Sequence, residues 1–259
     1  MSEARRRPRV GVQLHLEHTG LPALRAAWRD ADQAAVDSIW TWDHFFPITG
    51  DPAGPNLEGW TMLAAIAVET SRASIGVLVS CCAYRGPDLV ADMARTIDHL
   101  SGGRAILGLG AGWYERDFRE YGYPFGTAGT RLRELERHLR RVRERLGRLN
   151  PPPLGPLPIL VGGLGERVTL RLVAEHADMW SSGAVTPAVF AARRAALDDW
   201  CRRVGRRPED IERSASYDPE AADPVALLEA GVQHLVMEWK HPFERRHLAR
   251  LVELRERAR

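Results

Sequence analysis

The stretch LPILVGGLGERVTLRLVAEHADMW, residues 157–180, contains a strand, a glycine turn, a helix and the start of another strand. Residues 159–161 are apolar and predict a buried strand, and residues 166–176 carry apolar side chains at helical spacing. Between them, Gly162, Gly163 and Gly165 let the backbone approach a ligand closely. The N–H groups that begin the helix favour an anion. This turn is therefore either a phosphate site or only a tight connection between strand and helix.

The same alternation of strand and helix continues along the chain. We predict strands at residues 10–14, 38–42, 73–80, 104–109, 159–161, 179–181, 211–217 and 234–239, and helices at residues 21–35, 60–70, 87–100, 115–121, 129–149, 166–176, 187–204, 224–230 and 243–258. About eight such units in 259 residues predict a single (β/α)8 TIM barrel, with residues 1–259 as one domain. A doubly wound open sheet is the alternative, but its glycine fingerprint is missing after the first strand.

Composition narrows the choice of partners and compartment. A net charge of +2 gives no reason to expect nucleic acid as a partner. No apolar run approaches the ~18 residues that span a membrane, and the short basic N-terminus is not followed by a secretory signal. The three cysteines, Cys81, Cys82 and Cys201, do not form a disulfide framework. We therefore expect a cytoplasmic protein without membrane contact.

In a barrel, reactive groups belong at the C-terminal ends of the strands, which form its mouth. Polar, aromatic and glycine residues follow the predicted strands: His15, Glu17, His18, Trp42, Asp43, His44, Ser80, Cys81, Gly110, Ala111, Gly112, Trp113, Ser181, Ser182, Trp239, Lys240 and His241. This gathering predicts a functional site at that end.

Asp43-His44 is the best acid/base candidate. Histidine titrates near neutrality, and a neighbouring carboxylate can orient it. The alternative is a loop histidine preceded by a helix-capping aspartate. Trp40, Trp42 and Phe45 surround the pair in the sequence, which favours the functional interpretation.

Other reactive groups are weaker candidates. His15 and His18 have no third ligand at a suitable spacing, so no metal site is predicted. Nothing near Cys81 and Cys82 in the sequence would lower their pKa values, which favours buried structural thiols over nucleophiles. Lys240 is the single lysine and is geometrically suited to a Schiff base, but a solvated or phosphate-pairing role is the stronger interpretation.

Four stretches resemble the bacterial luciferase-like superfamily, and within it the oxidoreductases that use coenzyme F420. They are residues 38–45 (SIWTWDHF), 95–113 (RTIDHLSGGRAILGLGAGW), 157–180 and 229–235 (EAGVQHL), and they span nearly the whole chain in the order of the family. The resemblance implies hydride transfer between the F420 deazaflavin and a small organic substrate in the barrel mouth. An FMN-dependent monooxygenase is the alternative, followed by a non-catalytic cofactor-binding barrel and by a Lys240 aldolase.

The resemblance also implies roles for single residues. The ring would lie over the third strand, at a non-prolyl cis peptide between Ser80 and Cys81. Asp43 would meet the polar edge of the ring, and His44 would handle the proton. Ala111, Gly112 and Arg116 would line the tail of the cofactor, and Gly162, Gly163, Gly165, Glu166 and Arg167 would hold its phosphate. The substrate pocket would contain His15, Trp42, Trp113 and Trp239.

The sequence differs from the family in two places, and the resemblance also implies a state of assembly. The sugar-phosphate dehydrogenases of the family have a catalytic glutamate where Trp113 stands, which argues against that activity. Residues 148–156 are shorter than in most relatives, where this segment helps to wall the pocket. Barrels of this family often pair, so a homodimer is possible here.

Overall fold

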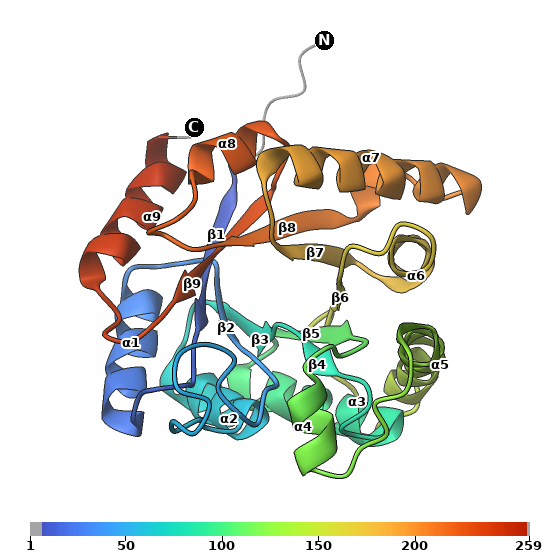
Figure 1. The fold of residues 1–259 in the computed structure, drawn as a ribbon, viewed down its shortest axis with the longest axis horizontal. Helices are drawn as coiled ribbons and strands as arrows, with labels where there is room; N and C mark the ends of the chain where they lie inside the picture. The colour runs from blue at the N-terminus through green and yellow to red at the C-terminus, as the bar shows by residue number, and fades with distance from the viewer. Residues whose placement is uncertain (1–6, 258–259) are drawn as a thin grey trace.

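The computed structural model describes residues 7–257, which form a (β/α)8 barrel (Figure 1). The strands are β1 (Arg9–Leu14), β2 (Ser38–Thr41), β3 (Ser74–Val77), β4 (Ser80–Cys81), β5 (Ala105–Gly110), β6 (Ile159–Gly162), β7 (Met179–Ala184), β8 (Glu212–Tyr217) and β9 (His234–Trp239). The helices are α1 (Leu21–Gln33), α2 (Gly59–Glu69), α3 (Pro87–Ser101), α4 (Glu115–Glu120), α5 (Ala128–Leu146), α6 (Thr169–His176), α7 (Pro187–Arg203), α8 (Pro224–Glu229) and α9 (Arg245–Arg257), with a short 3-10 helix at Pro208–Asp210.

The parallel sheet closes on itself. Its order is β3-β2-β1-β9-β8-β7-β6-β5-β4, and a further pairing of β3 with β5 joins the two ends. Both β3 and β4 pair with β5, through Ile75 with Ala105 and Ser80 with Leu109. They are therefore two halves of one strand position, and nine strands fill the eight positions of the barrel. The predicted barrel is confirmed.

Alternate residues of each strand supply two separate cores, because successive side chains point to opposite faces. The larger core packs between sheet and helices and includes Val12 and Leu14 of β1. A smaller cluster of Trp40, Ile106, Leu160, Met179 and Val236 fills the barrel interior. Trp40 is fully buried there, so the barrel is a packed core with its open end at the mouth.

Two predicted elements differ from the structure in ways that matter for the site. The third strand, predicted as continuous over residues 73–80, is interrupted at Leu78 and Val79. The peptide bond between these two residues is cis, so the expected position at Ser80–Cys81 is wrong by two residues. The helix expected from Glu166 begins at Thr169, because residues 166–168 form a turn.

The short proline-rich connection from α5 to β6 lies at the opposite end of the barrel from the mouth. Helix-to-strand connections enter strands at their N-terminal ends. The buried carboxylate of Asp98, near the end of α3, accepts hydrogen bonds there from the N–H groups of Leu154 (2.7 Å) and Gly155 (2.9 Å). This segment therefore lies away from the mouth of the barrel.

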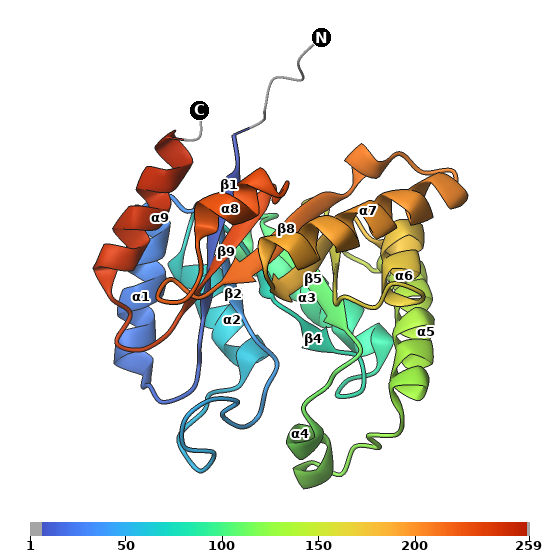
Figure 2. The ribbon, with the colours of Figure 1, turned by 45° about the horizontal axis from the view of Figure 1, so that its top comes forward.

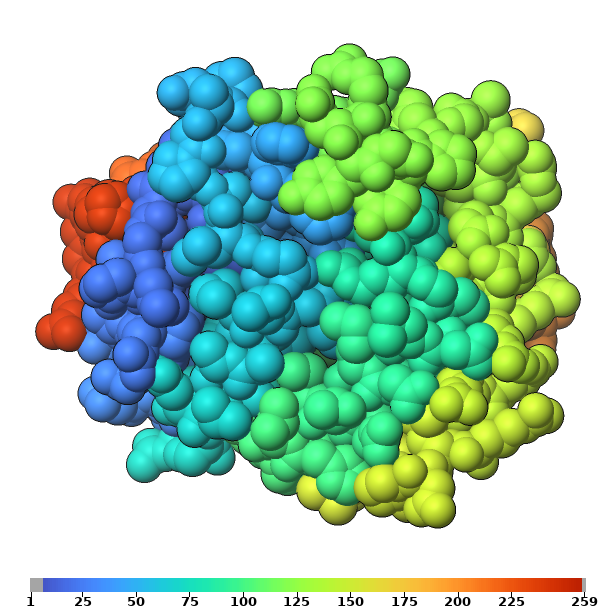
Figure 3. All heavy atoms as spheres, turned by 90° about the horizontal axis from the view of Figure 1, so that it is seen from below, coloured from blue at the N-terminus to red at the C-terminus, as the bar shows by residue number. Residues whose placement is uncertain are grey.

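Two segments extend beyond the barrel at the mouth. Residues 42–58, which connect β2 to α2, and helix α4 project from the same end (Figure 2). On the outer face, α2 and α3 lie side by side (Figure 3). Among the described helices, none has the combination of length and apolar character that membrane crossing requires.

Candidate active site

His44 pairs with a carboxylate that is distant in the sequence. Its Nδ1 lies 2.7 Å from Oδ2 of Asp117, a fully buried residue in α4. An ionised carboxylate only accepts hydrogen bonds. Nδ1 therefore carries the proton and donates a hydrogen bond to Asp117. No residue in the described part of the chain forms a hydrogen bond with Nε2 of His44. The pair therefore leaves one ring nitrogen available for proton exchange with a bound molecule.

Asp117 also fixes the backbone that carries His44. Its Oδ1 accepts hydrogen bonds from the N–H groups of Phe45 (3.1 Å) and Phe46 (3.2 Å). The hydroxyl of Tyr84 donates to Oδ2 at 3.3 Å. One buried carboxylate thus orients both the imidazole and the loop around it.

Aromatic rings form a continuous row from the end of β1 to the segment after β5. Ring centroids are 4.3 Å apart for His15 and Trp42, 5.5 Å for Trp42 and His44, and 5.6 Å for His44 and Trp113. Tyr114 lies 5.6 Å from His44 on the same side. Trp113 is 62% exposed, whereas Trp42 is 4% exposed. The structure therefore brings three of the four predicted pocket residues together around His44.

Asp43 does not orient His44. Its Oδ1 and Oδ2 lie 2.9 and 2.8 Å from Nη1 of Arg85, and Oδ2 accepts from Ser80 Oγ (3.0 Å) and from the Cys81 N–H (2.9 Å). Burial raises the pKa of the Asp43 carboxyl, and Arg85 opposes that rise. The carboxylate therefore clamps Ser80 and Cys81 of β4 to the loop after β2. The expected contact of Asp43 with His44 is therefore absent among the described residues, and the carboxylate that contacts His44 is that of Asp117.

Leu78 and Val79, between β3 and β4, are partly exposed and pack against the interior cluster. Gln13 of β1 donates from Nε2 to the carbonyl of Leu78 at 2.6 Å. Two glycines make room for Val79: a Cβ at Gly110 would meet Val79 Cγ2 at 2.5 Å, and one at Gly162 would meet Cγ1 at 3.0 Å. The ends of β5 and β6 can thus approach the surface that Leu78 and Val79 form.

The glycine turn after β6 contains unused hydrogen-bond donors. Gly163, at φ +133°, donates to the Ser181 carbonyl at 2.9 Å, and the Leu170 N–H donates to Gly165 at 3.0 Å. Within residues 7–257, the N–H groups of residues 164–169 have no acceptor. Arg167 is exposed and pairs with no acid in that range. Consecutive free N–H groups beside a free guanidinium are suited to binding an anion.

Two of the residues predicted to line the cofactor tail, Ala111 and Gly112, directly follow β5, the strand that pairs with β6. A Cβ at Gly112 would meet Cys81 Sγ at 2.5 Å, which explains the glycine there, and the Gly112 carbonyl accepts from Arg131 Nε at 3.1 Å. Arg116 stacks on Phe46 (4.1 Å) and donates to the carbonyl of Pro52 at 2.5 Å. Arg116 therefore fastens α4 to the loop after β2.

Glu17 fastens the same loop from the end of β1. Its carboxylate accepts from the N–H groups of Ile48 (2.7 Å) and Thr49 (3.2 Å), and His15 Nδ1 lies 3.5 Å away. Burial would raise the pKa of Glu17, but the contact with His15 and the hydrogen bonds from Thr49 and Ile48 lower it to about 2. His18 Nε2 bonds the Thr49 carbonyl at 2.8 Å. The loop is thus held by contacts from two directions.

Two predicted site residues point away from the mouth. Trp239 is 1% exposed and belongs to the core between sheet and helices, 5.6 Å from Phe243. The side chain of Glu166 pairs with Arg193 of α7. Successive side chains of β9 point to opposite faces of the sheet. Glu238 points into the barrel, so Trp239 points outward, into the core between sheet and helices.

The pKa values of the nucleophile candidates are shifted in the direction that disfavours nucleophilic attack. Burial raises the pKa of Cys81 to about 12, and it also raises the pKa of Cys82, as expected for structural thiols. Lys240 donates to Asp218 at 2.7 Å. Burial lowers the pKa of Lys240, but the ion pair with Asp218 outweighs it and raises the pKa. A protonated lysine is not a Schiff-base nucleophile.

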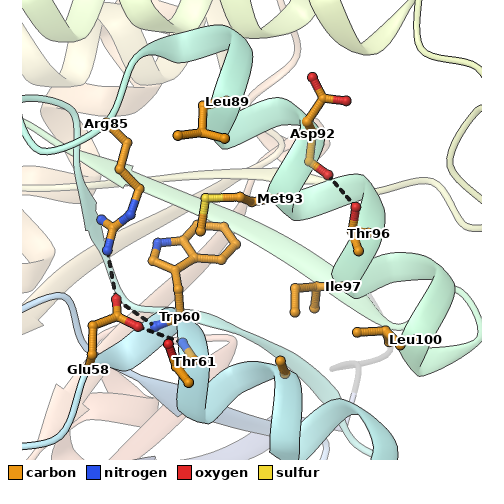
Figure 4. A pocket seen from close by; sticks show the side chains of 11 residues that line it. Glu58, Trp60, Thr61, Arg85, Leu89, Asp92, Met93, Thr96, Ile97 and Leu100 are labelled. Carbon is orange, nitrogen blue, oxygen red and sulfur yellow. Dashed lines mark hydrogen bonds and ion pairs between the residues drawn. The ribbon is translucent and has the colours of Figure 1, made fainter.

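A cavity of about 480 Å³ lies outside the barrel, between α2 and α3. Figure 4 shows the ion pair of Arg85 with Glu58 (2.7 Å) beside Trp60 at this cavity. Trp60 Nε1 donates to Ser80 Oγ at 3.0 Å, and Arg85 holds Asp43. Two residues that line the cavity, Trp60 and Arg85, therefore hold Ser80 and Asp43 in position. The cavity itself does not open onto His44.

Sequence reasoning missed Asp117, Arg85 and Gln13. Each is a polar residue without a motif, in a helix, a turn and a strand respectively. Alternation along β1 could have assigned Gln13 to the barrel interior, because it lies between the helix-facing Val12 and Leu14. Asp117 and Arg85 depend on contacts across the fold and had no sequence signal.

Residues 7–258 match the family described as luciferase-like monooxygenase. The chain belongs to this family. An uncharacterised protein of Mycobacterium tuberculosis is 30% identical over 184 residues, 63% of this chain and 59% of that protein. Pyrimidine monooxygenase RutA of Enterobacter sp. (strain 638) is 28% identical over 186 residues, 64% of this chain and 48% of that protein. The chain thus spans about half the length of these curated relatives.

Solved structures share the fold at low sequence identity. An F420-dependent secondary alcohol dehydrogenase in complex with an F420-acetone adduct superimposes with a TM-score of 0.86 at 15% identity, covering 98% of this chain and 99% of that one. The oxygenating constituent of 3,6-diketocamphane monooxygenase from Pseudomonas putida, in complex with FMN, gives 0.66 at 17% identity, with 82% and 67% covered.

Proposed function

We propose that this chain, acting as one domain, is an oxidoreductase that uses coenzyme F420 to move a hydride to or from a small organic substrate. The observation that carries the proposal is the anion site of residues 164–169, which lies at the same mouth as His44. The likeness over the full length to an F420-dependent alcohol dehydrogenase supports F420 as the first choice. When bound, the deazaflavin supplies two-electron hydride chemistry.

The residues of the mouth fit such a cofactor. The free N–H groups of residues 164–169 and Arg167 would hold its phosphate. Leu78 and Val79 would face its ring, in place of the expected Ser80 and Cys81, because their side chains are partly exposed and the latter two are buried. Ala111 and Gly112 would line its tail. Asp43 would act indirectly, by holding β4 in position.

His44 would handle the proton that accompanies the hydride. Oxidation of an alcohol to a carbonyl removes a hydride from carbon and a proton from oxygen. Nε2 of His44 would accept that proton, and in the reverse direction it would return it. Asp117 keeps the proton of the imidazole on Nδ1 and so keeps Nε2 ready to accept. The exposed ring of Trp113 would cover the substrate beside His44.

FMN is the alternative cofactor, because the likeness to an FMN-containing monooxygenase supports the same phosphate turn for a flavin. The retained His44–Asp117 pair argues against a non-catalytic barrel. The three buried cysteines, none of them in a disulfide, support a cytoplasmic location. A homodimer remains a prediction.

Anaerobic titration of the purified protein with F420 and, separately, with FMN tests the proposal. We expect saturable changes in the absorbance and fluorescence of F420, with weaker binding of FMN. Tight binding of FMN without binding of F420 would select the monooxygenase alternative. Binding of neither cofactor would exclude both.

A further inference from the structure

Three side chains of the metal-ligand type meet between the loop after β8 and the start of α9. Glu220 lies in that loop, Glu244 directly precedes α9, and His247 lies in its first turn. One ligand atom from each lies within 4.8 Å of the others. Across residues 7–257, no other group of histidine, cysteine and acidic residues has this spacing. The cluster is separate from His44 and from the glycine turn.

The buried histidine is the second, independent observation. His247 is 7% exposed, and its Nε2 is buried without a hydrogen bond, although Glu220 Oε1 lies 2.7 Å away. Nε2 of His247 and Oε1 of Glu220 are therefore close enough to contact one ion. His247 thus points into the cluster, where its ring contacts Glu220.

We propose that Glu220, Glu244 and His247 bind a divalent transition-metal ion, with Zn²⁺ as the preferred ion. Zinc accepts imidazole nitrogen and carboxylate oxygen together, whereas calcium and magnesium prefer oxygen alone. The spacing of three residues places Glu244 and His247 on one side of the start of α9. Glu220 supplies the third ligand from a different segment, and water would complete the coordination. The site departs from the sequence expectation of no metal.

Arg246 competes with the ion for the same carboxylates. Its Nη2 lies 3.2 Å from Glu220 Oε1, and its Nε pairs with Glu244. The Arg246 side chain is 60% exposed, so it can turn into solvent at little cost. Removal of this guanidinium should therefore strengthen metal binding, a direction opposite to that expected for the loss of a ligand.

A bound ion would fix the loop after β8 to α9. The same loop contains Asp218, which holds Lys240 at the end of β9 with a contact of 2.7 Å. Metal binding would therefore stabilise one side of the barrel mouth without contact to His44. This inference does not depend on the identity of the cofactor.

Isothermal titration of the chelator-treated full chain with ZnCl₂ tests the site. We expect one saturable site and a higher melting temperature with zinc than with EDTA. His247→Gln should weaken zinc binding at least tenfold, and Glu244→Gln, at an exposed position, should also weaken it. Arg246→Gln should tighten it severalfold. His99→Gln, on α3, is the matched control and should leave the affinity unchanged.

The results that would overturn the proposal are specific. They are the absence of saturable binding by the wild-type chain, or equal affinities of the wild type, Glu244→Gln and His99→Gln. A failure of His247→Gln to fold leaves Glu244→Gln and Arg246→Gln as decisive measurements, because both replace exposed side chains.

Discussion

At the scale of single residues, the site depends on which carboxylate faces His44. Asp43 is adjacent in the sequence, but successive residues in an extended segment point in different directions. Asp43 therefore contacts Arg85, and Asp117, 73 positions after His44, is the partner of the histidine. Adjacency in the sequence misassigned the pair, while the identity of the histidine remains the sequence prediction.

The His44–Asp117 pair leads to a prediction about turnover. His44→Gln should lower the turnover rate at least about 100-fold, because general acid–base catalysis contributes ~10²–10⁴. Asp117→Asn keeps an acceptor for the loop N–H groups but places a donor near Nδ1, which disfavours the tautomer with a free Nε2. It should lower the rate less. Steady-state kinetics with a reactive substrate, alongside the dissociation constant of the cofactor, measures both effects.

The control for this experiment is His99→Gln, on α3, which should change neither quantity. An unchanged rate for His44→Gln would remove the histidine from the mechanism. If His44→Gln weakens cofactor binding but keeps the wild-type turnover rate at saturating cofactor, His44 has a binding role instead.

Glu17 provides a pH prediction. Its folded pKa of about 2 lies below its ordinary value of 4.5, so the folded state is favoured wherever the carboxylate is ionised. This contribution is full above pH 4.5 and is lost as pH falls through 4.5 toward 2, amounting to at most about 3 kcal/mol. Glu17→Gln should therefore be less stable than wild type at pH 7, and the gap should narrow below pH 4.5. Urea unfolding at a series of pH values measures it.

The exposed Glu253→Gln serves as the control for Glu17, and its stability should follow that of wild type at each pH. A gap between Glu17→Gln and wild type that stays constant from pH 7 to 3 would contradict the argument.

At the scale of elements, the glycine turn and α6 act together. The turn extends to residue 168, so the helix starts three residues later than predicted, and the N–H groups of residues 164–169 are left free. The sequence pattern correctly predicted the strand, the turn and the helix. The number of free donors depends on turn geometry, which periodicity does not report.

Arg167→Gln tests the turn as an anion site. Because Arg167 is exposed and unpaired within the described residues, the substitution should leave the free energy of unfolding unchanged. A hydrogen bond to a charged group contributes about 1.5–3 kcal/mol, so cofactor affinity should fall roughly 10- to 100-fold. Fluorescence titration measures the affinity, with the exposed Arg133→Gln of α5 as the control. Equal affinities in wild type and Arg167→Gln would remove Arg167 from the site.

At the scale of the whole molecule, one end of the barrel carries the candidate site and the opposite end carries contacts that stabilise the fold. The mouth carries His44, the glycine turn and the loop after β2. At the opposite end, Asp98 joins three elements, because it accepts hydrogen bonds from Leu154, Gly155 and the Ala105 N–H that begins β5 (3.3 Å). Buried His234 lies between Ser38 (2.7 Å) and Glu212 (2.8 Å) in the same layer. These contacts support the closed barrel.

Asp98→Ala should lower the free energy of unfolding by about 2–4 kcal/mol, because it leaves buried N–H groups without an acceptor. Asp92→Ala, on the same helix, removes partly exposed ion pairs with Arg95 and Arg145 and should cost less than about 1 kcal/mol. Guanidinium unfolding followed by circular dichroism compares the two. Equal losses of stability would show that Asp98 is not a structural hub.

The sequence alone determined the barrel, the order of its elements and the end at which the site lies. These follow from local periodicity and from the rule that strands of a barrel present their C-terminal ends together. Tertiary structure alone decided that Asp117 serves His44, that Asp43 serves Arg85 and β4, and that Trp239 packs in the core. Contacts between residues far apart in the chain have no local signal, because they arise only when the closed sheet brings distant elements together.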